Sequence, residues 1–280
     1  MHAISHRLRS DSRFPLASML GVGICLLLVM AVVATPAAAE ESKAPHKDAV
    51  ERLEIVDRAI EFHGGELFLW SNSELLVSSK SGSFKVRSTM SGSRFDHQVE
   101  SQTEEGKRIV VRSRNDSVER REDGVVVPLN DEQEQRARDF VSARTYFPFL
   151  PFRLNDADAY KIDQGIETWG NRSLHRVKVV FAAGSSTDAS DEYVYFFDPK
   201  TARLEAYGYT FGTGRERGGL RYRKLFNYRR VEGLLFFDAE NLGVSGEGSF
   251  TVDSLNEKFV ETLEPVSTIE LSEIEVESLL

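Results

Sequence analysis

The sequence contains almost no cysteine. Cys25 is the only one, and it lies in an apolar segment close to the N-terminus. The rest of the chain therefore cannot form a disulfide or use thiol chemistry. A domain built from the remaining residues must draw its stability from a hydrophobic core, and the chain is long enough to bury one.

The sequence also lacks the motifs of common catalytic and metal sites. It contains no G-x-S-x-G nucleophile motif, no H-E-x-x-H zinc motif and no glycine-rich phosphate loop. The histidines beyond the N-terminal segment do not have the spacing of metal ligands. These absences predict a protein that is not an enzyme and that uses no metal and no cofactor.

Basic residues are fewer than acidic residues in this chain. The chain has 35 Lys and Arg against 44 Asp and Glu, for a formal net charge of −9. Because nucleic-acid binding depends on neutralising phosphates with basic side chains, we expect no nucleic-acid partner.

Long hydrophobic runs are absent as well. The apolar run from Leu20 to Ala34 is shorter than the ~20 residues that a spanning helix needs, and arginines precede it. Ala37 and Ala39 then form an A-x-A cleavage pattern. We expect residues 1–39 to be a signal peptide cleaved after Ala39, which predicts a periplasmic or secreted protein without a stable transmembrane anchor. An uncleaved anchor and a lipid-modified Cys25 are the alternatives.

The remaining residues read as one domain. A flexible polar lead-in covers 40–47, and a single domain is expected over 48–280, beginning with a helix from Asp48 to Gly64. Short alternating segments then predict an antiparallel meander, interrupted by a second helix that starts near Asn130. Turns are predicted at residues 198–201 and 232–233, and "STIELSEIEVE" predicts a last edge strand. We expect a monomer.

The segment "YFPFLPFRLND", residues 146–156, concentrates aromatic side chains around two prolines. Proline lacks an N–H, so the segment is neither a helix interior nor a central strand. In "DEYVYFFD", residues 191–198, both strand faces are apolar, so the sheet needs a cover on each face. We therefore expect the aromatic segment to lie on the concave face of a curved sheet, either as core or as the wall of a ligand cavity. The residues expected to line such a cavity are Trp70, Phe140, Phe147, Phe149, Phe152 and Phe196.

An arginine-rich stretch, residues 214–230, stands out in this acidic chain. Arg221, Arg223 and Arg229 share one strand face by alternation, while Tyr222 and Tyr228 share the other. These arginines are candidates for contact with an anion or a protein partner. The alternative is a solvated strand face that pairs with acidic neighbours.

Two histidines are candidates for buried positions or for acid–base roles. His97 shares its strand face with Phe95 and Val99, which predicts an interior side chain. His63 lies at the end of the first helix, where the helix dipole favours a cation. If the protein were an enzyme, His97 or His63 together with a nearby carboxylate would be the candidates for acid and base.

The order of elements resembles a known family. "AIEFHGG" and "YFPFLPFRLND" are the specific features, and the "FDPKTARL" hairpin is a looser one. Over residues 49–245 the chain resembles an uncharacterised domain-of-unknown-function family of secreted bacterial proteins. That family is distantly similar to the periplasmic lipoprotein carriers of the LolA/LolB type, which sort outer-membrane lipoproteins.

The resemblance implies an α+β fold that is mostly antiparallel β. It would be a half-open curved β-barrel with an N-terminal helix, and an inserted helix plus the aromatic segment would cover the concave face. It also implies a non-catalytic protein that binds or carries a lipid or acyl chain. The alternatives are an envelope scaffold with a self-filled barrel and a protein partner, and an enzyme that uses the same cavity.

Overall fold

The computed structural model describes residues 52–182, 190–212, 218–246 and 249–280. These all belong to one compact unit, Ser42–Leu280. The expected signal peptide, Cys25, the polar lead-in and the Asp48 cap lie outside the described residues. None of the helices in the described ranges is both long and apolar enough to cross a membrane.

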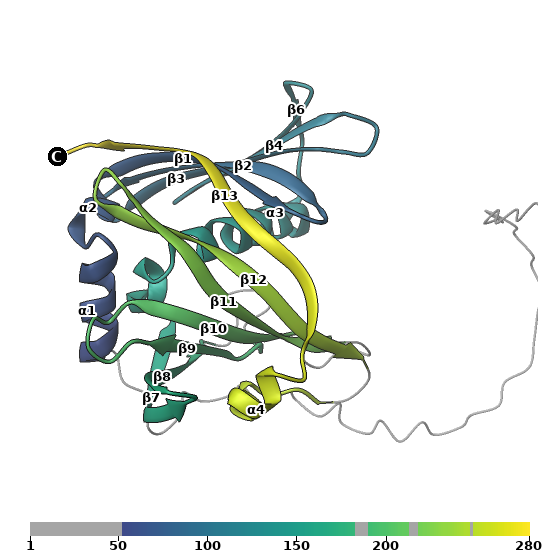
Figure 1. Cartoon of the computed structure of the whole chain (residues 1–280). Coiled ribbons are helices and arrows are strands. Elements are labelled where there is room, and N and C mark those ends of the chain that lie inside the picture. The colour runs from purple at the N-terminus through teal and green to yellow at the C-terminus, as the bar shows by residue number, and fades with distance from the viewer. Residues whose placement is uncertain (1–51, 183–189, 213–217, 247–248) are drawn as a thin grey trace, which may run out of the picture. The chain divides into compact units, whose positions relative to one another are not determined.

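Thirteen strands form one antiparallel sheet in the order β6-β5-β4-β3-β2-β1-β13-β12-β11-β10-β9-β8-β7. The first six strands are β1 (Ser71–Ser79), β2 (Gly82–Ser91), β3 (Arg94–Gln102), β4 (Arg108–Arg114), β5 (Val118–Glu122) and β6 (Val125–Val127). The others are β7 (Ala159–Trp169), β8 (Arg172–Phe181), β9 (Tyr193–Phe197), β10 (Leu204–Phe211), β11 (Gly218–Val231), β12 (Leu234–Gly246) and β13 (Glu264–Ser278). The sheet is open and curved (Figure 1).

The last strand lies in the middle of this sheet. β13 pairs with β1 on one side and with β12 on the other, and Figure 1 shows it in yellow between them. The expectation of an edge strand was therefore wrong. The exposed face of β13 is rich in glutamate, and a central strand with one face in water has the same alternation as an edge strand.

The helical segments are few and short. They are α1 (Glu54–His63), α2 (Glu66–Leu69), α3 (Asp131–Tyr146), η1 (Phe147–Phe149), η2 (Phe152–Asn155), η3 (Val252–Ser254) and α4 (Glu257–Val260). The predicted cap of α3 is confirmed: the Asn130 side chain accepts from Gln133 N–H, and the Gln133 side chain accepts from Asn130 N–H. The predicted end of α1 is also confirmed, because Gly64 adopts a φ of 140° that only glycine takes easily.

Two faces of the sheet carry separate cores. We call the inner face the one that carries α1, α3 and the aromatic segment, and the outer face the one that carries η3 and α4. The predicted alternation in β9 is confirmed, since Tyr195 belongs to the inner core and Phe196 to the outer core. The outer cover, residues 252–260, was not expected from the sequence. The expected fold class, a curved antiparallel sheet with helices on its inner face, is confirmed (Figure 1).

A β-bulge in β11 changes the alternation halfway along the strand. Asn227 has a φ of 50°, and the pairing with β12 shifts between Phe226 and Arg229. Tyr228 consequently packs against the inner core and donates its hydroxyl to the Leu204 carbonyl at 2.7 Å. The expectation that Tyr228 shares a face with Tyr222 was wrong, because the bulge falls between them.

Candidate functional site

A cavity of about 250 Å³ lies on the inner face, between α3–η1 and strands of the sheet. We call it the inner cavity. Its lining is mostly apolar and consists of Val77, Ser79, Phe84, Ala143, Arg144, Phe147, Pro148, Tyr207, Arg223, Phe237, Ala239, Ile269 and Leu271. These residues come from β1, β2 and β10–β13 as well as from the helical cover. Apolar walls with a few polar groups are typical of small-molecule sites.

The strands that form one wall of the cavity are only partly paired. β12 and β13 pair from Ala239 to Gly243, and the two strands separate at the Ala239 end of this pairing, at Asp238 and Leu271. Where they separate, the Leu271 N–H donates to Asp238 Oδ1 at 2.9 Å, and Arg229 donates to the Leu271 carbonyl. Arg229 also pairs with Asp238 at 3.0 Å. These side chains replace the missing backbone bonds, so Arg229 holds the sheet together at this point.

Arg223 brings a positive charge to the cavity. Its Nη1 donates to the Tyr207 hydroxyl at 2.8 Å, and its Nη2 donates to the Tyr209 hydroxyl at 3.0 Å. Its guanidinium lies 4.5 Å from the centre of the Phe147 ring. The Nε is buried and has no hydrogen-bond partner among the described residues.

Aromatic stacking fixes the position of this guanidinium. Phe147 stacks on Tyr207 with 5.3 Å between ring centres and 9° between ring planes. Phe147 is carried by η1, which continues α3 directly and contains Pro148. The burial of Tyr207 raises its pKa to about 12, so its phenol is protonated at neutral pH and can donate.

Arg144 is the second cation of the inner cavity. Its guanidinium lies 3.6 Å from the centre of the Phe140 ring, and Nη1 donates to the Phe140 carbonyl at 3.3 Å. Burial lowers the pKa of Arg144, although an arginine remains charged at neutral pH. No aspartate or glutamate is among the described residues that line the cavity. The described lining of the inner cavity is therefore positively charged, although the chain as a whole has a negative net charge.

The six aromatic residues expected to line a cavity are not brought together. Phe147 lines the inner cavity, and Phe140 lies beside it under Arg144. Phe149 is 2 % exposed and packs with Phe68 in the neighbouring core, and Phe152 stacks on Phe68 at 4.3 Å.

The other two are further away in the fold. Phe196 is fully buried in the outer core, against Trp169 and Tyr222. Trp70 follows α2, and its ring lies close to Gly92 at the β2–β3 turn. The aromatic segment is thus mainly core, and Phe147 and Pro148 are its two residues among the described lining of the cavity.

The three candidate arginines have three different surroundings. Arg223 lines the inner cavity, and Arg229 joins β12 to β13. The Arg221 guanidinium lies 4.4 Å from the centre of the Phe211 ring and donates to the Leu220 and Val244 carbonyls. Residues 214–217 of the arginine-rich stretch lie outside the described residues.

Sequence reasoning missed Tyr207, Phe84 and Arg144 as cavity residues. Tyr207 lies directly opposite Arg223 in the β10–β11 pairing. An aromatic–arginine pair on neighbouring strands could have suggested the contact, but the strand register was unknown. Arg144 could have been found from its place on α3, two residues before the aromatic segment.

His63 and His97 are both buried and neutral. Burial lowers the pKa of His63 to about 3 and that of His97 to about 4. His63 Nε2 accepts a hydrogen bond from Leu204 N–H at 3.2 Å, so the expected cation at the end of α1 was wrong. His97 is interior, as predicted, and stacks on Phe95 at 4.7 Å. Neither ring contacts a carboxylate within the described ranges.

These pKa values predict a loss of stability in acid. Both are lowered from an unfolded value of 6.5, so below pH 6.5 the unfolded chain binds protons that the folded chain does not. The contribution of the two neutral histidines to the free energy of unfolding is fully present above about pH 6.5 and decreases as the pH falls towards 4. For His97 alone the loss at pH 5 is about 2 kcal/mol. Urea unfolding at pH 7 and pH 5 should show His97→Phe losing about 2 kcal/mol less than the wild type. If both proteins lost the same free energy of unfolding between pH 7 and pH 5, His97 would not be a source of the acid sensitivity.

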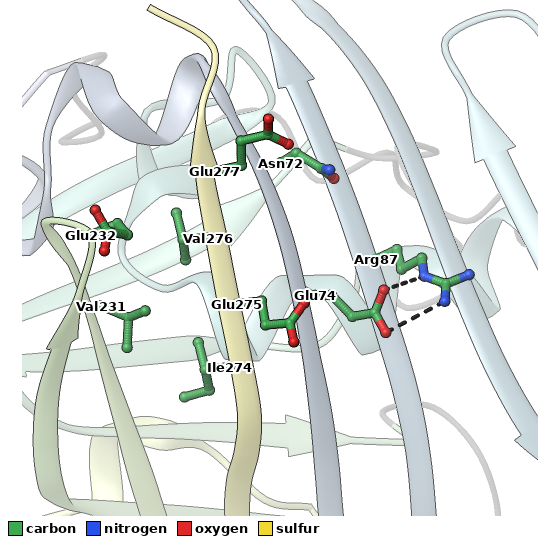
Figure 2. A pocket seen from close by; sticks show the side chains of 9 residues that line it. All are labelled: Asn72, Glu74, Arg87, Val231, Glu232, Ile274, Glu275, Val276 and Glu277. Carbon is green, nitrogen blue, oxygen red and sulfur yellow. Dashed lines mark hydrogen bonds and ion pairs between the residues drawn. The ribbon is translucent and has the colours of Figure 1, made fainter.

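A second, larger groove lies on β13 next to the β11–β12 turn. It measures about 540 Å³ and is lined by Asn72, Glu74, Arg87, Val231, Glu232, Ile274, Glu275, Val276 and Glu277. Figure 2 shows Glu74 directed towards Arg87, with Glu275 nearby, while Val231 and Ile274 lie on the other side of the β13 backbone. Arg87 and Lys85 both pair with Glu74. Carboxylates dominate this groove, which makes it unsuitable for anions.

No group of three or more His, Cys, Asp or Glu residues within the described ranges could hold a metal ion. The closest histidine–carboxylate contact seen there joins His175 Nε2 to Asp163 Oδ1 at 2.7 Å. That pair lies on the β7–β8 hairpin, and neither residue lines the inner cavity.

The model of a family of unknown function, DUF6503, matches residues 98–259, which are 162 of the 280 residues. The chain belongs to this family. The expected membership of an uncharacterised domain-of-unknown-function family is thereby confirmed. The DUF6503 match contains Arg144, Tyr207 and Arg223, whereas the cavity residues of β1, β2 and β13 lie outside it.

Several solved structures are similar to this DUF6503 chain. A LolA superfamily protein from Nitrosomonas europaea is 9% identical with a TM-score of 0.46, covering 81% of this chain and 93% of that one. A putative outer membrane lipoprotein-sorting protein domain from Vibrio parahaemolyticus is 11% identical with a TM-score of 0.43, covering 81% and 92%. A DUF1329 family protein from Desulfovibrio piger is 13% identical with a TM-score of 0.46, covering 81% and 93%. No curated protein matches the chain.

Proposed function

We propose that the protein binds a hydrophobic or amphipathic molecule in the inner cavity and carries it without changing it chemically. The observation that supports this is the cavity itself, whose lining is mostly apolar and comes from α3, η1 and six strands. Each buried CH₂ group of an acyl chain contributes about 0.8 kcal/mol to the free energy of binding. Burial of several such groups against these walls would therefore give a single acyl chain a measurable affinity.

The N-terminal sequence supports a proposal for where this activity takes place. We propose that residues 1–39 are removed as a signal peptide and that the single domain acts as a monomer in the periplasm or outside the cell. The supporting features are the arginines before the apolar run and the A-x-A pattern at Ala37 and Ala39.

A scaffold function is the second candidate. It is favoured by the aromatic segment, whose side chains are buried: Leu150 and Leu154 lie in the inner core, and Phe149 lies in the neighbouring core with Phe68. In that case the protein would contact an envelope partner and would take up no ligand.

The first test is organic extraction and mass spectrometry of the protein purified from its native source without detergent. A stoichiometric apolar molecule is the expected result.

The second test uses a variant that obstructs the cavity. Ala143 is an exposed residue of α3 that lines the cavity, so Ala143→Trp should obstruct it with little effect on folding.

Uptake of the neutral fluorescent probe N-phenyl-1-naphthylamine should fall at least about fivefold in Ala143→Trp, on the order of 1 kcal/mol. Gln135→Trp is the matched control, because Gln135 is also exposed on α3 but does not line the cavity. If extraction finds no apolar molecule in the native protein and the purified wild type also takes up no probe, ligand binding is rejected and the scaffold function is favoured.

A further inference from the structure

We infer that the inner cavity selects a single-chain amphiphile with a carboxylate head, and that Arg223 holds this head with help from Arg144. The inference rests on the proposed function and adds the chemical class of the ligand. It is carried by the hydrogen-bond geometry of Arg223, by the charges of the cavity lining and by the size of the cavity.

Arg223 has N–H donors that are not used within the described residues. A guanidinium has five N–H donors. One goes to the Tyr207 hydroxyl and one to the Tyr209 hydroxyl, while the buried Nε–H has no partner among the described residues. A buried donor without a partner is costly, and a carboxylate is the group whose two oxygens match a guanidinium best.

The two tyrosines prepare the guanidinium for this contact. Both hydroxyls act as acceptors for Arg223, so they fix its orientation without neutralising its charge. Phe147 covers the guanidinium at 4.5 Å and limits its movement. Tyr207 itself lines the cavity and keeps its own O–H to donate to a second acceptor.

The charge of the cavity favours an anion. Among the described residues, the cavity lining has two arginines and no aspartate or glutamate, although acids outnumber bases in the whole chain by 44 to 35. A cationic head would meet two like charges, and a neutral head would leave them uncompensated. Only an anion complements the lining.

The size of the cavity suits a single acyl chain. At about 250 Å³ the cavity is smaller than the ~300–1,000 Å³ typical of sites for drug-sized ligands. One acyl chain against Val77, Phe84 and Ile269 suits this volume, whereas the two chains of a phospholipid do not. A free fatty acid is therefore favoured over a membrane lipid.

The experiment compares head groups on a constant chain. Dodecanoate, dodecanol, dodecyltrimethylammonium and dodecyl phosphate, each below its micelle concentration, compete with N-phenyl-1-naphthylamine at pH 7.5. Dodecanoate is expected to bind about 10-fold to 100-fold more tightly than dodecanol, the value of hydrogen bonds to a charged group. Dodecyltrimethylammonium is expected to be the weakest competitor.

Variants then assign the selectivity to one residue. Arg223→Met should reduce the preference for dodecanoate over dodecanol to within about twofold, while the affinity for dodecanol is retained. Arg221→Met is the matched control, because Arg221 is two residues away on the same strand and does not line the cavity. It should leave the preference unchanged. If Arg223→Met does not fold, the wild-type head-group series and Arg144→Met decide.

The outcomes separate the inference from the proposed function. If dodecanol competes as well as dodecanoate, the cavity binds apolar molecules but the carboxylate assignment is overturned. A preference for dodecyl phosphate of more than about 10-fold would also overturn it, in favour of a phosphate head. If no compound and no probe binds, the proposed function fails together with the inference.

Discussion

Replacing Phe149 by alanine is expected to lower the free energy of unfolding by about 3–5 kcal/mol. Phe149 is 2 % exposed and packs against Phe68, with 5.5 Å between ring centres, and against the edge of Phe236. Removing the ring leaves a cavity where α2, η1 and β12 meet. Denaturant unfolding followed by circular dichroism measures the loss.

Phe152→Ala is the graded comparison, because Phe152 is only half-buried and stacks on the same Phe68 ring. Its expected loss is smaller, about 1–3 kcal/mol. Neither ring lines the inner cavity, so folded Phe149→Ala should take up the apolar probe within about twofold of the wild type. Lost uptake with unchanged stability would instead make Phe149 a ligand contact.

Replacing Asp238 by alanine is expected to destabilise the protein by about 2–4 kcal/mol, because it removes the buried carboxylate of a partly buried ion pair and leaves two further donors without this acceptor. The Asp238 side chain is 6% exposed and accepts from Arg229, from Asn227 and from the Leu271 N–H. All three donors lose their acceptor at the place where β12 and β13 separate. Thermal and urea unfolding of the variant measure the cost.

The matched control is Glu240→Ala, two residues further along β12. Glu240 pairs with Lys224 at 3.6 Å, and both side chains are about half exposed, 51% and 56%. An exposed pair of this kind contributes little, so the change should stay within about 0.5 kcal/mol. Equal effects of the two substitutions would show that Asp238 acts only as one more surface charge.

Local features of the fold could be predicted from the sequence, because their causes lie within a few residues. The capping of α3 depends on Asn130 and Gln133, which are three residues apart. The β9–β10 turn depends on Asp198, whose carboxylate accepts from the N–H groups of Lys200 and Thr201. Alternation likewise assigned Tyr195 and Phe196 to opposite faces.

Features that depend on distant partners could not be predicted. The central place of β13 depends on its pairing with β1, about 200 residues away, and nothing in its own alternation distinguishes a central strand from an edge strand. The Asn227 bulge moved Tyr228 and Arg229 to other surroundings. For the site, composition singled out Arg223 and Phe147, but only the strand register brings Tyr207 to them.

The position of β13 has a consequence for the order of folding. Strands β1–β6 form one consecutive meander and β7–β12 form another, and each can form from contacts close in the chain. Among the described strands, β13 alone joins the two meanders within the sheet, and it must close a loop of some 200 residues to reach β1. The entropy lost in closing so long a loop is paid before the contacts form, so we expect this pairing to form late in folding. The inner cavity has walls from both meanders and from β13, so we expect it to be completed late as well.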